Sequence, residues 1–122
     1  MNNRMWNSKN PYQGKSERVL CLCSAGLLRS PTTAVIMAQR GYNTRAAGLE
    51  TNFALIPIDD VLYSWADMVV VMDSSQAEEV DKHFDGPIYN FNLPDQFEYM
   101  HPDLVELINN RIENLEFHRW DV

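Results

Sequence analysis

The sequence is poor in cysteine, in basic residues and in long hydrophobic runs. Its only two cysteines, Cys21 and Cys23, are separated by a single residue, so it does not belong to the small domains held together by a disulfide framework. A reducing compartment, the cytoplasm, is the expected location. No stretch approaches the roughly 18 uninterrupted apolar residues of a transmembrane helix, so no membrane-spanning segment is predicted.

Basic residues are few and scattered, and the three histidines show no metal-ligand spacing. Ten Lys and Arg against 17 Asp and Glu give a formal net charge of −7. Nucleic acids and anionic membrane surfaces require a cluster of positive charge, so neither is expected as a partner. Because His83, His101 and His118 are dispersed, neither a metal site nor a cofactor is predicted.

The chain also lacks internal repeats, low-complexity segments and domain linkers. A length of 122 residues with 45% hydrophobic residues fits one domain with one core. Residues 1–17 form a polar N-terminal tail without the apolar run of a signal peptide. We therefore expect a tail over 1–17 and a single domain over 18–122.

The segment 18–31, RVLCLCSAGLLRSP, carries the most specific signal. Val19–Leu22 predicts a short buried strand, and Pro31–Arg40 predicts a helix that Ser30 and Pro31 open and Gly41 closes. The loop between them can direct its backbone N–H groups toward one point, beside the partial positive charge of a helix N-terminus. This arrangement predicts a phosphate-binding loop with a thiol at one end and a guanidinium at the other.

The side chains of this loop fit phosphoryl transfer to sulfur. A helix N-terminus and a nearby guanidinium favour the thiolate form of Cys23, which would be the nucleophile. Arg29 can hold two phosphoryl oxygens and stabilise the charge of the transition state. The Ser30 hydroxyl can donate to the Cys23 sulfur. The loop residues expected to bind the phosphate group are Ser24, Ala25, Gly26, Leu27, Leu28 and Ser30. These residues predict a cysteine-dependent phosphatase.

A leaving phenolic oxygen needs a proton from a carboxylic acid near the loop, partly removed from water. Asp95 is the first candidate because it follows the last predicted strand, Glu98 is the second, and Asp103 the third. Asp103 is better placed to start the final helix, and Asp73 to cap the helix that follows it. Three aromatic residues are expected either to form an apolar wall for a phenyl ring or to pack in the core: Phe53, Phe97 and Tyr99.

The remainder of the chain alternates between predicted strands and helices. Strands are predicted over 43–47, 67–72 and 87–91, and helices over 57–65, 73–84 and 103–117. Such alternation implies a doubly wound α/β sandwich, with a parallel sheet between two helical layers. Ligands bind beyond the carboxyl ends of such strands, which is where Cys23 falls.

Residues 23–31 resemble the phosphate loop of the low-molecular-weight protein tyrosine phosphatases, in which Cys-x5-Arg-Ser lies near the N-terminus. Residues 47–48 are similar to their Ser-Ala-Gly segment, and residues 70–73 to their buried strand ending in Met-Asp. The Leu-Pro-Asp-x-Phe-Glu pattern at 93–98 resembles a short bacterial and phage branch of predicted tyrosine phosphatases. The resemblance implies a flavodoxin-like four-stranded parallel sheet, a phosphocysteine intermediate and no metal.

Two departures from that family stand out. Gly26 occupies the loop position where the family usually has a bracing Asn. The family's late Asp-Pro, which supplies the general acid, is replaced here by the segment 93–99.

Several alternatives remain open at this stage. A phosphocysteine carrier of a sugar phosphotransferase system has a similar loop but lacks the guanidinium of Arg29, and a non-catalytic phosphate-binding module is the third hypothesis. An arsenate reductase would need cysteines after Cys23, and there are none. Cys21 is expected in the core, with a Cys21–Cys23 disulfide as the alternative. The expected partner is a phosphorylated protein, with basic residues flanking the phosphate, or a small phosphomonoester.

Overall fold

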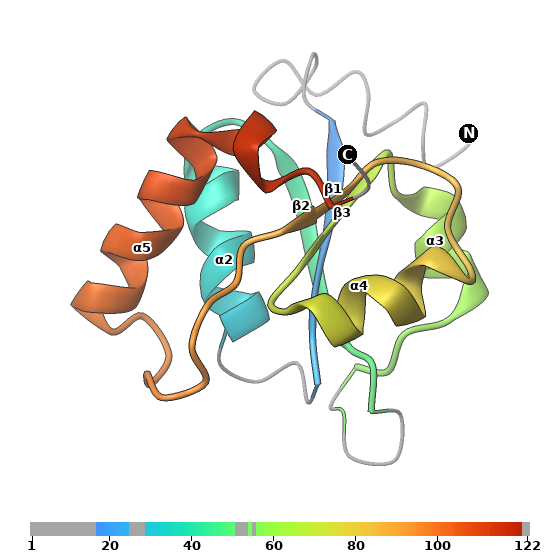
Figure 1. Cartoon of the computed structure of the whole chain (residues 1–122), viewed down its shortest axis with the longest axis horizontal. Helices are drawn as coiled ribbons and strands as arrows, with labels where there is room; N and C mark the ends of the chain where they lie inside the picture. The colour runs from blue at the N-terminus through green and yellow to red at the C-terminus, as the bar shows by residue number, and fades with distance from the viewer. Residues whose placement is uncertain (1–16, 25–28, 51–53, 55, 121–122) are drawn as a thin grey trace.

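The computed structural model describes residues 17–24, 29–50, 54 and 56–120 (Figure 1). Residues 1–16 of the predicted tail, the loop residues 25–28 and Phe53 lie outside the described residues. Four parallel strands form one sheet in the order β2-β1-β3-β4. These strands are β1 (Arg18–Cys23), β2 (Asn43–Gly48), β3 (Met68–Val71) and β4 (Ile88–Asn90).

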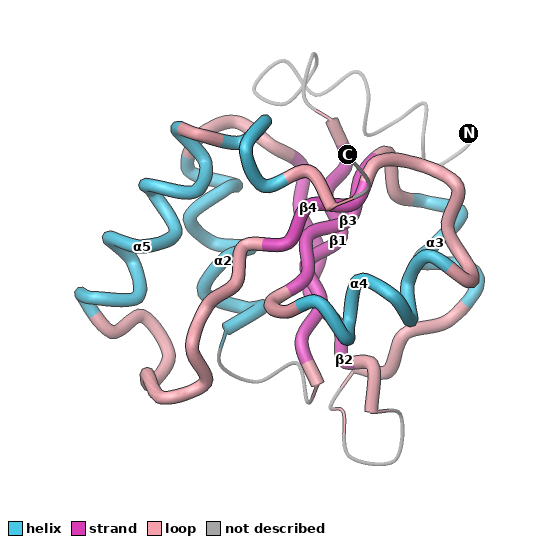
Figure 2. Tube along the Cα trace, viewed as in Figure 1, coloured by secondary structure: helices cyan, strands magenta, loops and turns pink. Residues whose placement is uncertain are grey.

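Helices cover both faces of this sheet, as Figures 1 and 2 show. Helices α2 (Arg29–Gln39) and α5 (Pro102–Glu113) lie on one face, and α3 (Asp60–Trp65) and α4 (Ser74–Asp81) on the other. A short 3₁₀ helix, η1 (Leu115–His118), follows α5. The predicted three-layer α/β sandwich with a flavodoxin-like four-stranded parallel sheet is therefore confirmed.

The central strands are apolar on both faces because both faces are covered. Along β1, Cys21 and Cys23 face the α2 and α5 layer, whereas Leu20 and Leu22 face the α3 and α4 layer. All four side chains are at most 4% exposed. Because successive side chains of a strand point to opposite faces, β1 contributes to both cores. The Cys23 side chain therefore lies on the face that α2 covers.

Helices α2 and α3 begin two and three residues from their predicted starts, whereas α4 and α5 begin within one residue of theirs. Helix α2 begins at Arg29 rather than at Pro31, so that proline occupies a later position of the first turn, where its missing N–H costs no hydrogen bond. Helix α3 begins at Asp60 rather than at residue 57, because Pro57 pairs with Gly48 in a bridge and Asp59 provides the N-cap.

Helices α4 and α5 end about three and four residues earlier than predicted. Helix α4 ends at Asp81 rather than near residue 84. After this end, the N–H groups of His83 and Phe84 both donate to the carbonyl oxygen of Val80. Helix α5 ends at Glu113 because Asn114 leaves helical geometry, and η1 replaces the last predicted turn. Helix α2 ends at Gln39, one residue before the predicted Arg40, and Gly41 lies just past this end with a φ of 100° that favours glycine.

Candidate active site

The predicted site lies at the carboxyl ends of β1 and β3. The chain order of the strands reverses between these two neighbours, which is the place where open α/β sheets form ligand crevices. Cys23 is the last residue of β1, and Arg29 is the first residue of α2. The strand and the helix thereby bring the two ends of the predicted phosphate loop to one edge of the sheet; its middle residues, 25–28, lie outside the described part.

A short chain of polar groups leads away from the Cys23 sulfur. The thiol donates to the Oγ of Ser30 across 3.1 Å, and the Ser30 hydroxyl lies 3.4 Å from the carbonyl oxygen of Ala47, to which it donates. Ser30 is 0% exposed and Cys23 is 4% exposed. The hydroxyl thus lies within hydrogen-bond distance of the sulfur and can donate to it when the thiol loses its proton.

Arg29 connects the loop to the segment that follows β4. Its Nη1 donates to the carbonyl oxygen of Leu93 across 2.9 Å, and its Nε lies 3.6 Å from Oδ1 of Asp95. The Arg29 side chain is 7% exposed, whereas that of Asp95 is 70% exposed. Asp95 is near the loop, as expected, but it lies in an open turn, so the partial removal from water that was expected of a general acid is absent.

The structure places the other candidate carboxylates elsewhere. Glu98 is exposed, and its backbone carbonyl accepts a hydrogen bond from the N–H of His101. Asp103 lies in the first turn of α5, as the sequence favoured. Asp73 is confirmed as the N-cap of α4, because its carboxylate accepts from the N–H of Gln76 across 3.0 Å.

The aromatic residues of the segment after β4 differ in their packing. Phe97 is half-buried against the α2 and α5 core, and its ring centroid lies 5.1 Å from that of His101. Tyr99 is 51% exposed. Thr32 of α2 holds this segment in place, because its Oγ1 accepts a hydrogen bond from the backbone N–H of Met100 across 3.0 Å. Arg29 and Thr32 therefore hold the segment that carries Asp95 against α2.

Gln76 is a site residue that the sequence did not reveal. Its Oε1 accepts from the N–H of Met72 across 2.8 Å, and its Nε2 donates to the Oγ of Ser24 across 3.4 Å. Gln76 is 5% exposed, and it links the end of β3 to the first residue of the loop. The sequence shows Gln76 in a capping-box pattern at the start of a helix. No sequence pattern connects it with Ser24, which lies 52 positions earlier.

Backbone hydrogen bonds from the segment after β2 support the same end of the loop. The N–H of Leu49 donates to the carbonyl oxygen of Cys23 across 2.9 Å, and the N–H of Glu50 donates to that of Ser24 across 2.8 Å. These bonds continue the β1–β2 ladder past the strand ends, so the first loop residue is held from two sides.

Cys21 is confirmed as a core residue. It is 0% exposed, and both cysteines are free thiols in the structure. Burial raises the pKa of the Cys21 thiol, and the neighbouring Cys23 raises it further. Cys21 therefore stays protonated and unreactive, which leaves the sulfur at the mouth of the sheet as the candidate nucleophile.

No group of three or more His, Cys, Asp or Glu side chains in the described part of the chain could hold a metal ion. No helix among the same residues is long and apolar enough to cross a membrane.

Neither a protein-family model nor the sequence of a curated protein matches this chain. Solved structures do share its fold. The tyrosine phosphatase Wzb from Escherichia coli K30 in complex with phosphate is 15% identical with a TM-score of 0.65, over 82% of this chain and 96% of that one. Vibrio vulnificus Wzb in complex with benzylphosphonate is 14% identical with a TM-score of 0.66, over 81% and 96%. The YwlE arginine phosphatase from Geobacillus stearothermophilus is 16% identical with a TM-score of 0.55, over 83% and 94%. The fold that the sequence resemblance implied is thereby confirmed.

Proposed function

We propose that this protein is a cysteine-dependent phosphatase that hydrolyses phosphomonoesters through a phosphocysteine intermediate on Cys23. The observation that carries the proposal is the Cys23 sulfur beside the Ser30 hydroxyl at the end of β1, with a buried Arg29 as the first residue of α2. A nucleophile, a group that stabilises it and a cation for the phosphoryl oxygens are the parts that this reaction needs.

In the first step, the Cys23 thiolate attacks phosphorus and forms an S–P bond while the P–O bond to the leaving group breaks. Arg29 and the N–H groups at the start of α2 hold the phosphoryl oxygens. The Ser30 hydroxyl turns from the Ala47 carbonyl to the sulfur, because a charged acceptor makes the stronger hydrogen bond. Ser30 thus stabilises the thiolate both as nucleophile and as leaving group.

Asp95 is proposed as the general acid and base. It donates a proton to the leaving oxygen in the first step, and in the second it removes a proton from the water that attacks the phosphocysteine. Its position rests on the 3.6 Å contact with Arg29, the residue that holds the phosphoryl group. A bound phenyl ring, lying against Phe97, would cover the carboxyl that is exposed without substrate. Glu98 has no such contact with Arg29 in the structure.

The proposed substrate is phosphotyrosine in proteins, with small phosphomonoesters as the alternative. Solved structures with this fold include a tyrosine phosphatase and an arginine phosphatase, so the fold is compatible with more than one phosphorylated side chain. The cytoplasm is the proposed location, because a thiolate nucleophile needs reducing surroundings. The proposed domain covers residues 18–122.

Hydrolysis of para-nitrophenyl phosphate by the full chain tests the proposal. Cys23→Ser should lose turnover, because a hydroxyl is a far weaker nucleophile near neutral pH. Cys21→Ala is the matched control and should retain turnover, since it removes the other sulfur without touching the loop. Equal turnover in wild type and Cys23→Ser would overturn the proposal.

The same experiment separates the two other functions that the loop could serve. A phosphocysteine carrier would hold the phosphoryl group and release no inorganic phosphate, and a binding module would show no turnover at all. The buried Arg29 beside the loop favours hydrolysis over storage, because its charge stabilises the transition state of each phosphoryl-transfer step.

A further inference from the structure

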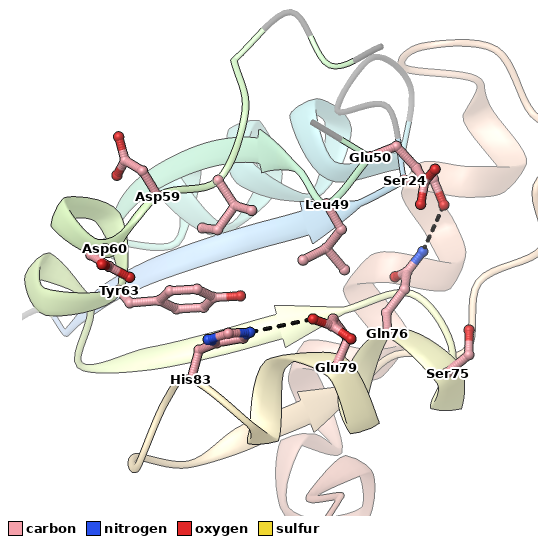
Figure 3. A pocket seen from close by; sticks show the side chains of 11 residues that line it. Ser24, Leu49, Glu50, Asp59, Asp60, Tyr63, Ser75, Gln76, Glu79 and His83 are labelled. Carbon is pink, nitrogen blue, oxygen red and sulfur yellow. Dashed lines mark hydrogen bonds and ion pairs between the residues drawn. The ribbon is translucent and has the colours of Figure 1, made fainter. Parts of the chain in front are cut away.

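A cavity opens beside the candidate active site, on the sheet face that carries α3 and α4 (Figure 3). Its volume is about 620 Å³, and Ser24, at the start of the phosphate loop, forms part of its wall. Ser75, Gln76, Glu79 and His83 present one face of α4 and the turn after it along the cavity. From the helical rise, that face is about 12 Å long. We call this cavity the α3–α4 cleft.

The α3–α4 cleft is acidic. Among the described residues that line it, none is Lys or Arg and four carry carboxylates: Glu50, Asp59, Asp60 and Glu79. Glu79 lies 3.3 Å from the His83 ring and 3.4 Å from Lys82, which is outside the lining. Even with Glu79 paired in this way, the carboxylates of Glu50, Asp59 and Asp60 leave the described lining with a net negative charge. The cleft therefore attracts cations immediately beside the loop that would hold a phosphate.

Tyr63 gives an independent indication that the cleft takes a polar ligand. The residue is 9% exposed, its ring stacks on His83 at 5.7 Å, and its hydroxyl points into the cavity (Figure 3). Among the described residues, this hydroxyl has no hydrogen-bond partner. Burial and the carboxylates of Glu79 and Asp60 raise the pKa of Tyr63 to about 12. The hydroxyl stays protonated and can donate to an acceptor placed in the cleft.

We infer that the α3–α4 cleft binds the basic residues that flank the phosphorylated residue of a protein substrate. This inference rests on the proposed function, because it assumes that the phosphate occupies the neighbouring loop. Ser24, the first loop residue, joins the two regions, because it lines the cleft and accepts a hydrogen bond from Gln76, which also lines the cleft. About 12 Å accommodates roughly three or four extended residues. Their Lys or Arg side chains would face the carboxylates, and a backbone carbonyl would accept from Tyr63.

Three phosphotyrosine peptides test the inference on the full wild-type chain. One carries Lys residues before the phosphotyrosine, one carries them after it, and the third carries Gln at all those positions. One of the Lys peptides should have a kcat/KM about tenfold above that of the Gln peptide at low salt. The preference should shrink as ionic strength rises, because the attraction is electrostatic.

Two double variants locate the preference. In Glu50→Gln/Glu79→Gln, the ratio of kcat/KM for the Lys and Gln peptides should fall to about twofold or less. Glu106→Gln/Glu116→Gln removes the same charge from exposed positions on α5 and η1, outside the cleft, and should keep the wild-type ratio. An equal fall in both double variants would overturn the inference, because net charge would then explain the preference.

Para-nitrophenyl phosphate distinguishes a failure of the inference from a failure of the proposed function. If wild type hydrolyses it and treats the three peptides alike, the inference is wrong and the proposed function stands. If wild type hydrolyses neither this ester nor any peptide, the proposed function is wrong, and the inference is overturned with it.

Discussion

Arg29 connects the phosphate loop with the segment after β4, which carries the proposed general acid. It is buried at the start of α2, yet it bonds to Leu93 and contacts Asp95, which lie more than sixty positions later. One N–H group is occupied by the Leu93 carbonyl, which fixes the plane of the guanidinium. The group that would bind the phosphoryl oxygens therefore also places the proposed general acid.

Asp95→Asn tests that placement. Turnover of phosphotyrosine should fall by about 10²–10⁴-fold, because the leaving oxygen loses its proton donor. The loss should be smaller for aryl esters whose leaving groups are weakly basic, so steady-state rates across a series of aryl phosphates are the measurement. Glu98→Gln is the matched control and should behave as wild type. A large loss in Glu98→Gln with none in Asp95→Asn would transfer the acid role to Glu98.

Prediction from sequence succeeded for the local part of the site and missed what joins distant segments. The spacing from Cys23 to Ser30 predicted a strand end and a helix start, and the structure has the end of β1 at Cys23 and the start of α2 at Arg29. Gln76 was interpretable only as a helix-start residue, because its bond to Ser24 depends on how β1 and β3 pair. The exposed state of Asp95 was missed for the same reason, since burial is decided by segments outside its own loop.

At the scale of elements, α4 holds the site through its first turn. Asp73 caps this helix and thereby fixes Gln76, which reaches the Ser24 hydroxyl. Asp73→Ala should lower the free energy of unfolding by about 1 kcal/mol, because it removes the cap. Asp73→Asn keeps a capping oxygen and is the control, with stability near wild type. Urea unfolding gives both values, and a stable Asp73→Ala variant would argue against this role of the cap.

Element types were predictable where periodicity and end signals agreed, and boundaries were not. Gly41 marks the end of α2 because a positive φ there favours glycine. Asn114, in contrast, interrupts the final helix through its own backbone geometry and a side-chain bond to the carbonyl of Asn110. Asn is compatible with a helix in sequence terms, so the apolar face predicted one helix where the structure has α5 followed by η1.

Across the whole molecule, the two ends of the sheet differ in function: one carries the candidate site and the other an ion pair that stabilises the fold. The carboxyl ends carry the candidate site, while an ion pair between Arg18 and Asp67 at 2.8 Å joins the starts of β1 and β3. Burial acts to raise the pKa of Asp67, but the hydrogen bonds and charge of Arg18 outweigh it and hold that pKa below its ordinary value. The folded state therefore favours the ionised carboxyl.

Asp67→Asn should reduce stability at neutral pH by about 1 kcal/mol, a figure reduced for the partial exposure of the carboxylate. Because the folded-state pKa lies below the unfolded one, the contribution is present above about pH 4 and is lost as the pH falls through the folded pKa. Urea unfolding of wild type and variant from pH 7 to pH 3 should show the difference closing. A constant difference would show that the charge of Asp67 is not its cause.

The central claim is that the Cys23 sulfur accepts the phosphoryl group. Acid quenching of the full chain during turnover, followed by intact-protein and peptide mass spectrometry, tests this directly. We expect one added phosphoryl group on the peptide that contains Cys23, more abundant in Asp95→Asn if the second step is slowed. Turnover without any adduct on Cys23, or with the phosphoryl group on another residue, would contradict the account.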